Sequence, residues 1–227
     1  MGDRAQRDDD DKAEKSRHQR VVVNALCVAS SMHWFAMMVG MQAERELMLR
    51  AFAGDFAGQA RLQSVLASVS SLLGFFIGPL IGAMSDAIGR KPVMLCAPAI
   101  AAFKAAGLIL RPGMTMVVLS QLLRPFTMTQ WWQGEQAALG DMFKNDARAL
   151  GAAQAKIHSL SSVNMIVCPI VGSFLARRDI RLPFVAGLCC YILNSWIAGR
   201  VLKETLPPSE RRPFTWRATL AIGETVI

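Results

Sequence analysis

At residues 78–91 the sequence reads GPLIGAMSDAIGRK, an apolar run that stops abruptly at one acid, one glycine and two bases. The run begins near Leu62 and reaches Met84 without a charged side chain. That is roughly the 20 residues that an α-helix needs to span a bilayer. A second apolar run begins at Pro92, so the chain must turn within about seven residues, a turn that Gly89 permits. The charges therefore predict a membrane surface.

The bases of this loop predict which surface it is. Arg90 and Lys91 make a short loop basic, and an excess of Lys and Arg in short loops is typical of the cytosolic side. If the N-terminus is also inside, sixteen Lys and Arg residues fall in cytosolic segments and seven in external ones. We therefore expect both termini in the cytosol, although Arg177, Arg178 and Arg181 together on the outside weaken the bias.

Composition points to an integral membrane protein. The 227 residues are 52% hydrophobic, the mean hydropathy is +0.30, and the apolar residues come in blocks of about 20. The formal charge of +8 lies mainly in tails and loops, so we expect the lipid bilayer as a partner and no nucleic acid. No nucleophile and base stand at a recognisable catalytic spacing, so an enzyme is not expected.

The apolar blocks divide the chain. Residues 1–20 are highly charged and almost free of apolar side chains, which predicts a disordered cytosolic tail. Residues 21–202 are expected to form a six-helix transmembrane bundle, with 42–61 as the first external loop. Residues 203–227 would begin a cytosolic central loop. The expected spans are residues 21–41, 62–84, 92–110, 114–139, 151–176 and 183–201.

The loop after the second span carries a family resemblance. The pattern Gly82-x-x-x-Asp86-x-x-Gly89-Arg90-Lys91 resembles the loop between helices 2 and 3 of the major facilitator superfamily, with Ala87 where that family usually has a base. The resemblance implies an all-α membrane fold in which these six helices form one half, and a loop that takes part in gating. The plainer alternative is a topology signal alone. Asp86 argues against it, because an acid at a helix C-terminus is disfavoured unless it is paired.

Later segments resemble the drug:proton antiporter branch of the same superfamily. The fourth span carries Arg124 and is followed by Asp141 and Arg148, as in that branch. In the fifth span, Cys168-Pro169-Ile170-Val171-Gly172-Ser173 stands where antiporters have Gly-Pro-x-x-Gly-Gly, so that signature is degenerate. Borders of the sixth span resemble tetracycline-efflux-like members. The matching borders cover residues 21–214.

Polar residues inside the spans are the candidate site. Burying a lipid-facing Arg124 would cost roughly 2.5 to 3.5 kcal/mol, so we expect it to face protein or a cavity and to serve coupling or substrate binding. His33 is either a packed, hydrogen-bonded residue or a proton carrier. Lys104 can simply snorkel to the surface. The expected cavity residues are Arg124, His33, Gln130, Glu135 and Asn164.

Small residues recur every fourth position in the second span. Ser70, Gly74, Gly78 and Gly82 share one helix face, and such spacing lets two helices approach closely. Two alternatives stay open: this face packs against the second half of a transporter, or it packs within the six-helix bundle. In the fifth span, Pro169 and Gly172 predict a kinked, closely packed helix.

The five cysteines all fall inside expected spans and lack the spacing of a zinc site or a disulfide framework. We expect buried thiols, no metal and no cofactor, while the antiporter resemblance allows a coupling proton.

The main hypothesis is a solute transporter that works by alternating access, with a small organic molecule as substrate and two six-helix halves about one site. The second half would be a missing segment or a homodimer partner. The alternative is a membrane protein that interacts or regulates without transport, or a truncated half-transporter.

Overall fold

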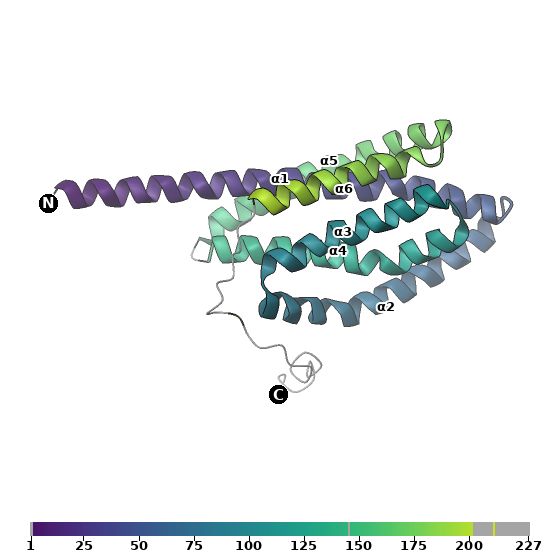
Figure 1. Cartoon of the computed structure of the whole chain (residues 1–227), viewed down its shortest axis with the longest axis horizontal. Coiled ribbons are helices and arrows are strands. Elements are labelled where there is room, and N and C mark those ends of the chain that lie inside the picture. Colours follow the sequence, from purple (N-terminus) through teal and green to yellow (C-terminus); the bar gives the residue numbers. More distant parts are fainter. Residues whose placement is uncertain (1, 145, 202–210, 212–227) are drawn as a thin grey trace.

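The computed structural model describes residues 2–144, 146–201 and 211, and these form six helices joined by short turns, without a strand in that part of the chain (Figure 1). The expected all-α fold is confirmed. The predicted loop at 203–227 lies outside the described residues, apart from Arg211. The helices are α1 (Gly2–Ala51), α2 (Phe56–Ile88), α3 (Arg90–Leu110), α4 (Met114–Met142), α5 (Ala147–Arg178) and α6 (Leu182–Val201).

In the part of the chain that the structure describes, five helices are long and apolar enough to cross a membrane: Gln19–Ala51 within α1, then α2, α3, α5, and Leu182–Arg200 within α6. The exception is α4, whose 29 residues suffice in length but carry too many polar groups. It packs against α1, α2, α3 and α5 inside the same bundle. The fourth predicted span is therefore a polar helix covered by its neighbours.

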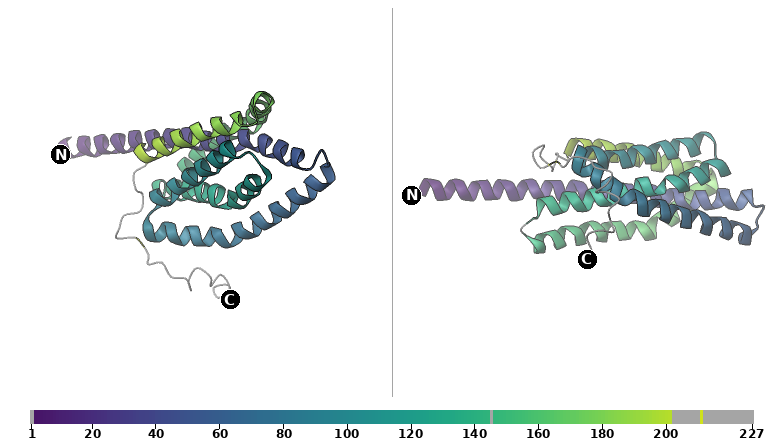
Figure 2. Two further views of the ribbon diagram at one scale, coloured as in Figure 1. Left: turned by 45° about the vertical axis from the view of Figure 1, so that its right-hand side comes forward. Right: turned by 90° about the horizontal axis from the view of Figure 1, so that it is seen from below.

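The helices pack in two related sets of three. On one side α1 packs against α5 and α6, on the other α4 packs against α2 and α3, and α3 contacts α6 (Figure 2). If α1, α2 and α3 are exchanged with α4, α5 and α6 in that order, the same packing pairs result. The α1–α5 pair then corresponds to α4–α2, and the α1–α6 pair corresponds to α4–α3. An internal repeat of this kind is common in secondary transporters.

Two predicted irregular segments are helical instead. Residues 2–20 continue α1 beyond the bundle (Figure 1). Extending a formed helix avoids the cost of nucleation, and eleven of residues 2–20 are Ala, Glu, Lys, Arg or Gln, which favour helix. The predicted external loop at 42–61 shrinks to residues 52–55, because Leu47 and Met48 bury their side chains in a core cluster with Leu66 and Leu108.

The turn between α2 and α3 is shorter than predicted. α2 ends at Ile88 and α3 begins at Arg90, so a single residue reverses the chain. That residue is the buried Gly89, with φ 122°. A side chain at this φ is strained, which explains why a glycine stands here.

The small-residue face of α2 packs within the bundle. Ser70 Oγ donates to the Gln121 carbonyl at 3.3 Å. A Cβ added at Gly74 would lie 3.7 Å from Pro125 Cβ, and one at Gly78 would lie 3.3 Å from Gln133 Nε2. These contacts are all to α4. Gly82 has no atom within 4 Å of an added Cβ, so only this end of the face stays open.

Two glycines lie where α5 and α6 approach α1 closely. A Cβ added at Gly172 would lie 2.5 Å from the Val39 carbonyl oxygen, which no side chain tolerates. Gly187 of α6 approaches α1 in the same way, with 3.2 Å from an added Cβ to the Ala36 carbonyl oxygen. Pro169 lies inside α5, which continues past it to Arg178. Glycines thus allow α1 to sit against two helices.

All five cysteines are free thiols. Cys27 and Cys168 are buried as expected, whereas Cys96 and Cys189 are exposed on the outside of the bundle. The prediction of uniformly buried thiols is therefore wrong, because a lipid-facing position tolerates an apolar thiol as well as a core position does.

Candidate functional site

A stripe of polar side chains runs along the contact between α1 and α4. On α1 it contains Ser30, His33 and Glu44, whose spacings of 3 and 11 residues place them on one helix face. The α4 residues that face them follow one another at intervals of one, three or four positions, and most of them are buried. The α4 members are Ser120, Gln121, Arg124, Thr127, Gln130, Trp131 and Glu135.

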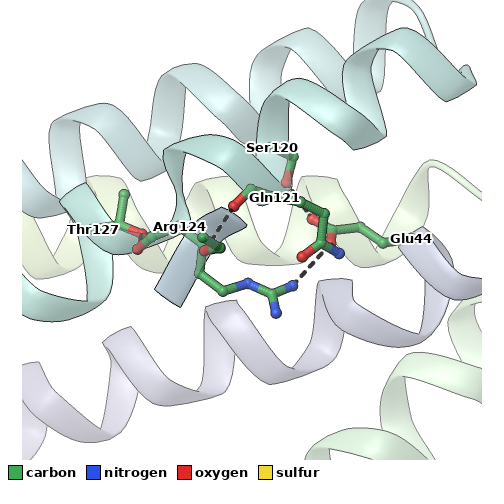
Figure 3. Close-up of polar contacts among 6 residues, drawn as sticks. Glu44, Ser120, Gln121, Arg124 and Thr127 are labelled. Atoms are coloured by element: carbon green, nitrogen blue, oxygen red, sulfur yellow. Dashed lines mark hydrogen bonds and ion pairs between the residues drawn. The ribbon is translucent and has the colours of Figure 1, made fainter. Parts of the chain in front are cut away.

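At one end of the stripe, three α4 side chains surround the Glu44 carboxylate (Figure 3). Ser120 Oγ donates to Oε1 and Gln121 Nε2 donates to Oε2 at 2.9 Å. Arg124 Nη2 lies 3.4 Å from Oε2 and forms an ion pair with it. Glu44 is only 7% exposed. A buried carboxylate needs such compensation, so this pair locks α1 to α4.

Beside this pair lies a cavity of about 210 Å³ between α1, α3, α4 and α6. Glu44, Lys104 and Arg124 supply one negative and two positive charges to its wall. Among the residues that the structure describes, Lys104 makes no hydrogen bond or salt bridge. Tyr191 and four adaptable thioether side chains complete much of the lining. The methionines are Met37, Met38, Met41 and Met128.

A second cluster lies further along the stripe. Ser30 Oγ donates to Glu135 Oε2 at 2.7 Å and accepts from Trp131 Nε1 at 3.1 Å. His33 stacks on Trp131 with 4.9 Å between ring centroids, and Tyr191 meets it edge-on at 5.6 Å. Aromatic contacts therefore pack His33, as its plainer interpretation expected, but the hydrogen bonds which that interpretation also expected are not found among the described residues.

Several buried polar atoms in this region lack a partner within the described part of the chain. Examples are Glu135 Oε1, Gln130 Oε1 and both ring nitrogens of His33. Asn194 of α6, which is fully buried, has neither side-chain atom bonded. Unpaired buried polar groups are rare in native structures and often accompany internal water or function. The cluster can therefore accept a water or a proton.

The predicted gating loop and the end of α4 form one charge cluster. Arg90 Nη1 lies 2.9 Å from Asp86 Oδ1, and Arg90 Nε lies 3.3 Å from Asp141 Oδ2. Lys91 Nζ donates to the Gly199 carbonyl at 2.8 Å. The turn at Gly89 thus joins the ends of α2, α3, α4 and α6. Asp86 forms an ion pair with Arg90, as expected for an acid near the C-terminal end of a helix.

Two predicted site residues lie apart from these clusters. Asn164 of α5 donates to the carbonyl and to Oγ of Ser31, at 2.9 and 3.0 Å, and so fastens α5 to α1. Arg148 lies in the first turn of α5 and is exposed. Neither of them lines the cavity beside Arg124.

Sequence reasoning missed the partner of Arg124. Glu44 fell in a predicted loop, although residues 41–51 contain neither Pro nor Gly and continue the helix. Its 11-residue distance from His33 was the available signal, because three helical turns return to the same face. Ser30, Ser120, Gln121 and Trp131 were also missed. No group of three or more His, Cys, Asp or Glu within the described ranges could hold a metal ion.

Comparison with known proteins identifies the family. The sequence profile described as Major Facilitator Superfamily matches residues 23–225. "Major facilitator superfamily domain-containing protein 10" of Bos taurus is 30% identical over 186 residues, covering 79% of this chain and 36% of that protein. "Tetracycline resistance protein, class C" of Escherichia coli is 27% identical over 158 residues, covering 68% and 38%. The chain thus spans well under half of these relatives.

A solved structure shares the fold. The human organic anion transporter MFSD10 (TETRAN) superposes with a TM-score of 0.75 at 19% identity, over 88% of this chain and 52% of that one. The predicted half of a major facilitator fold is therefore confirmed. The profile, the relatives and the multiple apolar helices agree: this chain is a multi-pass membrane protein that belongs to the Major Facilitator Superfamily, whose members are transporters and not enzymes.

Proposed function

We propose that this chain is one six-helix half of an alternating-access transporter that carries a small organic anion. The observation that carries the proposal is the Glu44–Arg124 ion pair beside a cavity that Lys104 also lines. Two cations against one carboxylate leave one positive charge uncompensated in that wall. That net positive charge attracts an anion, and Arg124 and Lys104 can pair with its acidic group.

Two further observations support this substrate class. The relative of known structure is described as an organic anion transporter. The methionines around the cavity supply flexible, polarisable apolar surface, which suits ligands with varied hydrocarbon bodies. The charged wall would hold the acidic group while the thioethers contact the remainder.

A coupling step follows from charge balance. A substrate carboxylate that binds Arg124 displaces the carboxylate of Glu44, and Glu44 then takes up one proton. The cavity wall gains one negative and one positive charge, so its net charge is unchanged. Binding of anion and proton would thus be linked at the contact between α1 and α4, which makes the coupling proton part of the proposal.

The charge cluster of Asp86, Arg90 and Asp141 is proposed to gate the same transporter. It joins helix ends at the surface that the base count assigns to the cytosol. Opening a cavity at that surface would require these helix ends to separate. With both termini cytosolic, the second six-helix unit would be another segment or another copy of this chain.

The test is anion flux in proteoliposomes that hold the chain as a demonstrated homodimer or with its second six-helix unit. Radiolabelled hippurate, a carboxylate that stays a monoanion near neutral pH, serves as the anion under an imposed pH gradient. We expect Arg124→Gln to lose uptake and Glu44→Gln to keep downhill uptake but lose its dependence on the gradient. Glu46→Gln, at an exposed ion pair with Arg50, is the matched control and should behave as the wild type. Uptake by Arg124→Gln at the wild-type rate would contradict the proposed site.

The need for a second unit is tested separately. A single six-helix unit leaves apolar faces of α2 and α5 open and encloses no path between two halves. We therefore expect no flux from the monomeric chain, with monomers established by photobleaching counts in the same vesicles. Uptake by a proven monomer would overturn this part of the proposal.

A further inference from the structure

An apolar groove follows the outer side of the contact between α3 and α4. One hollow of about 360 Å³ lies between Phe103 and Leu110 of α3 and Leu119 and Leu123 of α4. A second hollow of about 520 Å³ shares Phe103 and Leu123 with the first and continues to Phe126. Together they form one groove along the outside of the bundle. Phe103 and Leu110 are 70% and 77% exposed there, as lipid-facing side chains are.

Two bases stand along this groove at different depths. Arg111 is exposed at the end of α3 and marks the mouth. Lys104 lies seven residues earlier, about 10 Å deeper at 1.5 Å per helical residue. It also lines the cavity that contains Glu44 and Arg124. The wall between groove and cavity is completed by Ser120, which lines the groove and donates to Glu44.

Lys104 needs a compensating charge. An ammonium group in a transmembrane helix costs roughly 2.5 to 3.5 kcal/mol on insertion scales. Within the described chain Lys104 has no hydrogen-bond acceptor, and the nearby Glu44 carboxylate is already bonded to Ser120, Gln121 and Arg124. Its depth limits how far snorkelling alone can relieve that cost. An anion that lies in the groove at this depth would provide the missing partner.

We propose that the α3/α4 groove binds a single-chain anionic amphiphile from the bilayer, with its carboxylate on Lys104 and its hydrocarbon chain along Phe103, Leu123 and Phe126. The depth of Lys104 favours a fatty-acid-type carboxylate, because the larger phosphodiester head of a phospholipid remains at the surface near Arg111. The inference goes beyond the proposed function, since binding here requires no transport. Because Lys104 lines both the groove and the cavity, a groove-bound carboxylate and a cavity-bound anion would compete for its ammonium group.

The test is photolabelling of the chain in phosphatidylcholine nanodiscs. The probes are a long-chain fatty acid with a diazirine in its tail and the fatty alcohol of the same length. Mass spectrometry of the digested protein locates the labels. We expect the acid to label residues 99–126 at least fivefold more than the alcohol does. Lys104→Gln should reduce acid labelling to the level of the alcohol, and Lys104→Arg should retain it.

Matched variants separate charge from shape. Lys156→Gln removes a lysine that donates to Asn24 on the other side of the bundle and should leave labelling unchanged. Leu123→Trp fills the groove and should reduce labelling by both probes. Equal labelling by acid and alcohol in the wild type would overturn the proposal and show annular lipid only. The proposal would also be overturned if the fatty acid labelled a Lys104→Gln protein as strongly as the wild type, provided that this variant elutes like the wild type in size-exclusion chromatography.

Discussion

Glu44 of α1 and Arg124 of α4 lie 80 positions apart in the sequence and form an ion pair of 3.4 Å inside the bundle. The carboxylate also accepts from Ser120 and Gln121, so one turn of α4 supplies all three partners. The pair joins the central helices of the two three-helix sets, because α1 packs against α5 and α6, and α4 packs against α2 and α3. Any movement between these sets must either carry the pair along or break it.

Removing the Glu44 carboxylate should therefore destabilise the protein. Glu44→Gln leaves Arg124 without its counter-ion, and breaking a buried pair costs about 3–5 kcal/mol. The 28% exposure of the Arg124 side chain places the expected loss at the lower end. The measurement is thermal unfolding in detergent. Glu46→Gln, which breaks the exposed pair with Arg50, should cost less than about 1 kcal/mol, and equal losses in both variants would contradict this prediction.

Ser30 should matter more than an exposed serine, because it bonds two buried groups at once. Ser30→Ala removes the donor to Glu135 and the acceptor of the Trp131 indole N–H. A buried group left unpaired costs about 1–3 kcal/mol. The unfolding temperature should fall, while Ser159→Ala, which loses only an exposed bond to the Ala155 carbonyl, should not change it. Identical unfolding curves for the two variants would refute the prediction.

The crossing of α1 and α5 should not tolerate a methyl group. In Gly172→Ala the new Cβ meets the Val39 carbonyl oxygen, and a backbone atom can yield only if the helices separate. Overpacking of this kind costs about 1–3 kcal/mol. Gly82→Ala is the control, since open space surrounds that position. We expect lower yield of folded protein and a lower unfolding temperature for Gly172→Ala alone; wild-type stability would mean that the crossing is looser than the structure shows.

Asp86 and Asp141 should act together through Arg90, which contacts both. A double-mutant cycle of Asp86→Asn and Asp141→Asn tests this. Residues that share a partner show interaction energies of about 0.5–3 kcal/mol. We expect the lower end of that range, because the side chains are partly exposed. Strictly additive losses in chemical denaturation would show that the two acids are independent.

The orientation in the membrane can be read from two turns. Cysteine at Gly113, between α3 and α4, and cysteine at Ala147, after α4, lie at opposite ends of one helix. With the five native cysteines replaced, we expect an impermeant maleimide to label Gly113→Cys in intact cells and Ala147→Cys only after permeabilisation. The reverse pattern would invert the topology.

The helices themselves could be predicted because their causes are local. An uncharged apolar run of sufficient length forms a spanning helix whatever its neighbours, and Gly89 allows a reversal that other residues resist. The start of α4 at Met114 and its polar face were visible for the same reason. The family pattern around Asp86 was visible too. The charged residues 2–20 and 42–51 gave no clear local signal. They are helical because they extend the transmembrane part of α1, although their composition suggested a tail and a loop.

The sequence by itself determined which segments are long and apolar enough to cross a bilayer, and which polar residues must avoid lipid. The tertiary structure alone decided their partners. Glu44 reaches Arg124, Arg90 reaches Asp141 and Gly78 approaches Gln133 only because helices distant in sequence cross at particular points. Those points depend on side-chain shape along whole helix faces, and a bilayer constrains only how each helix is oriented, so no local pattern carries that information.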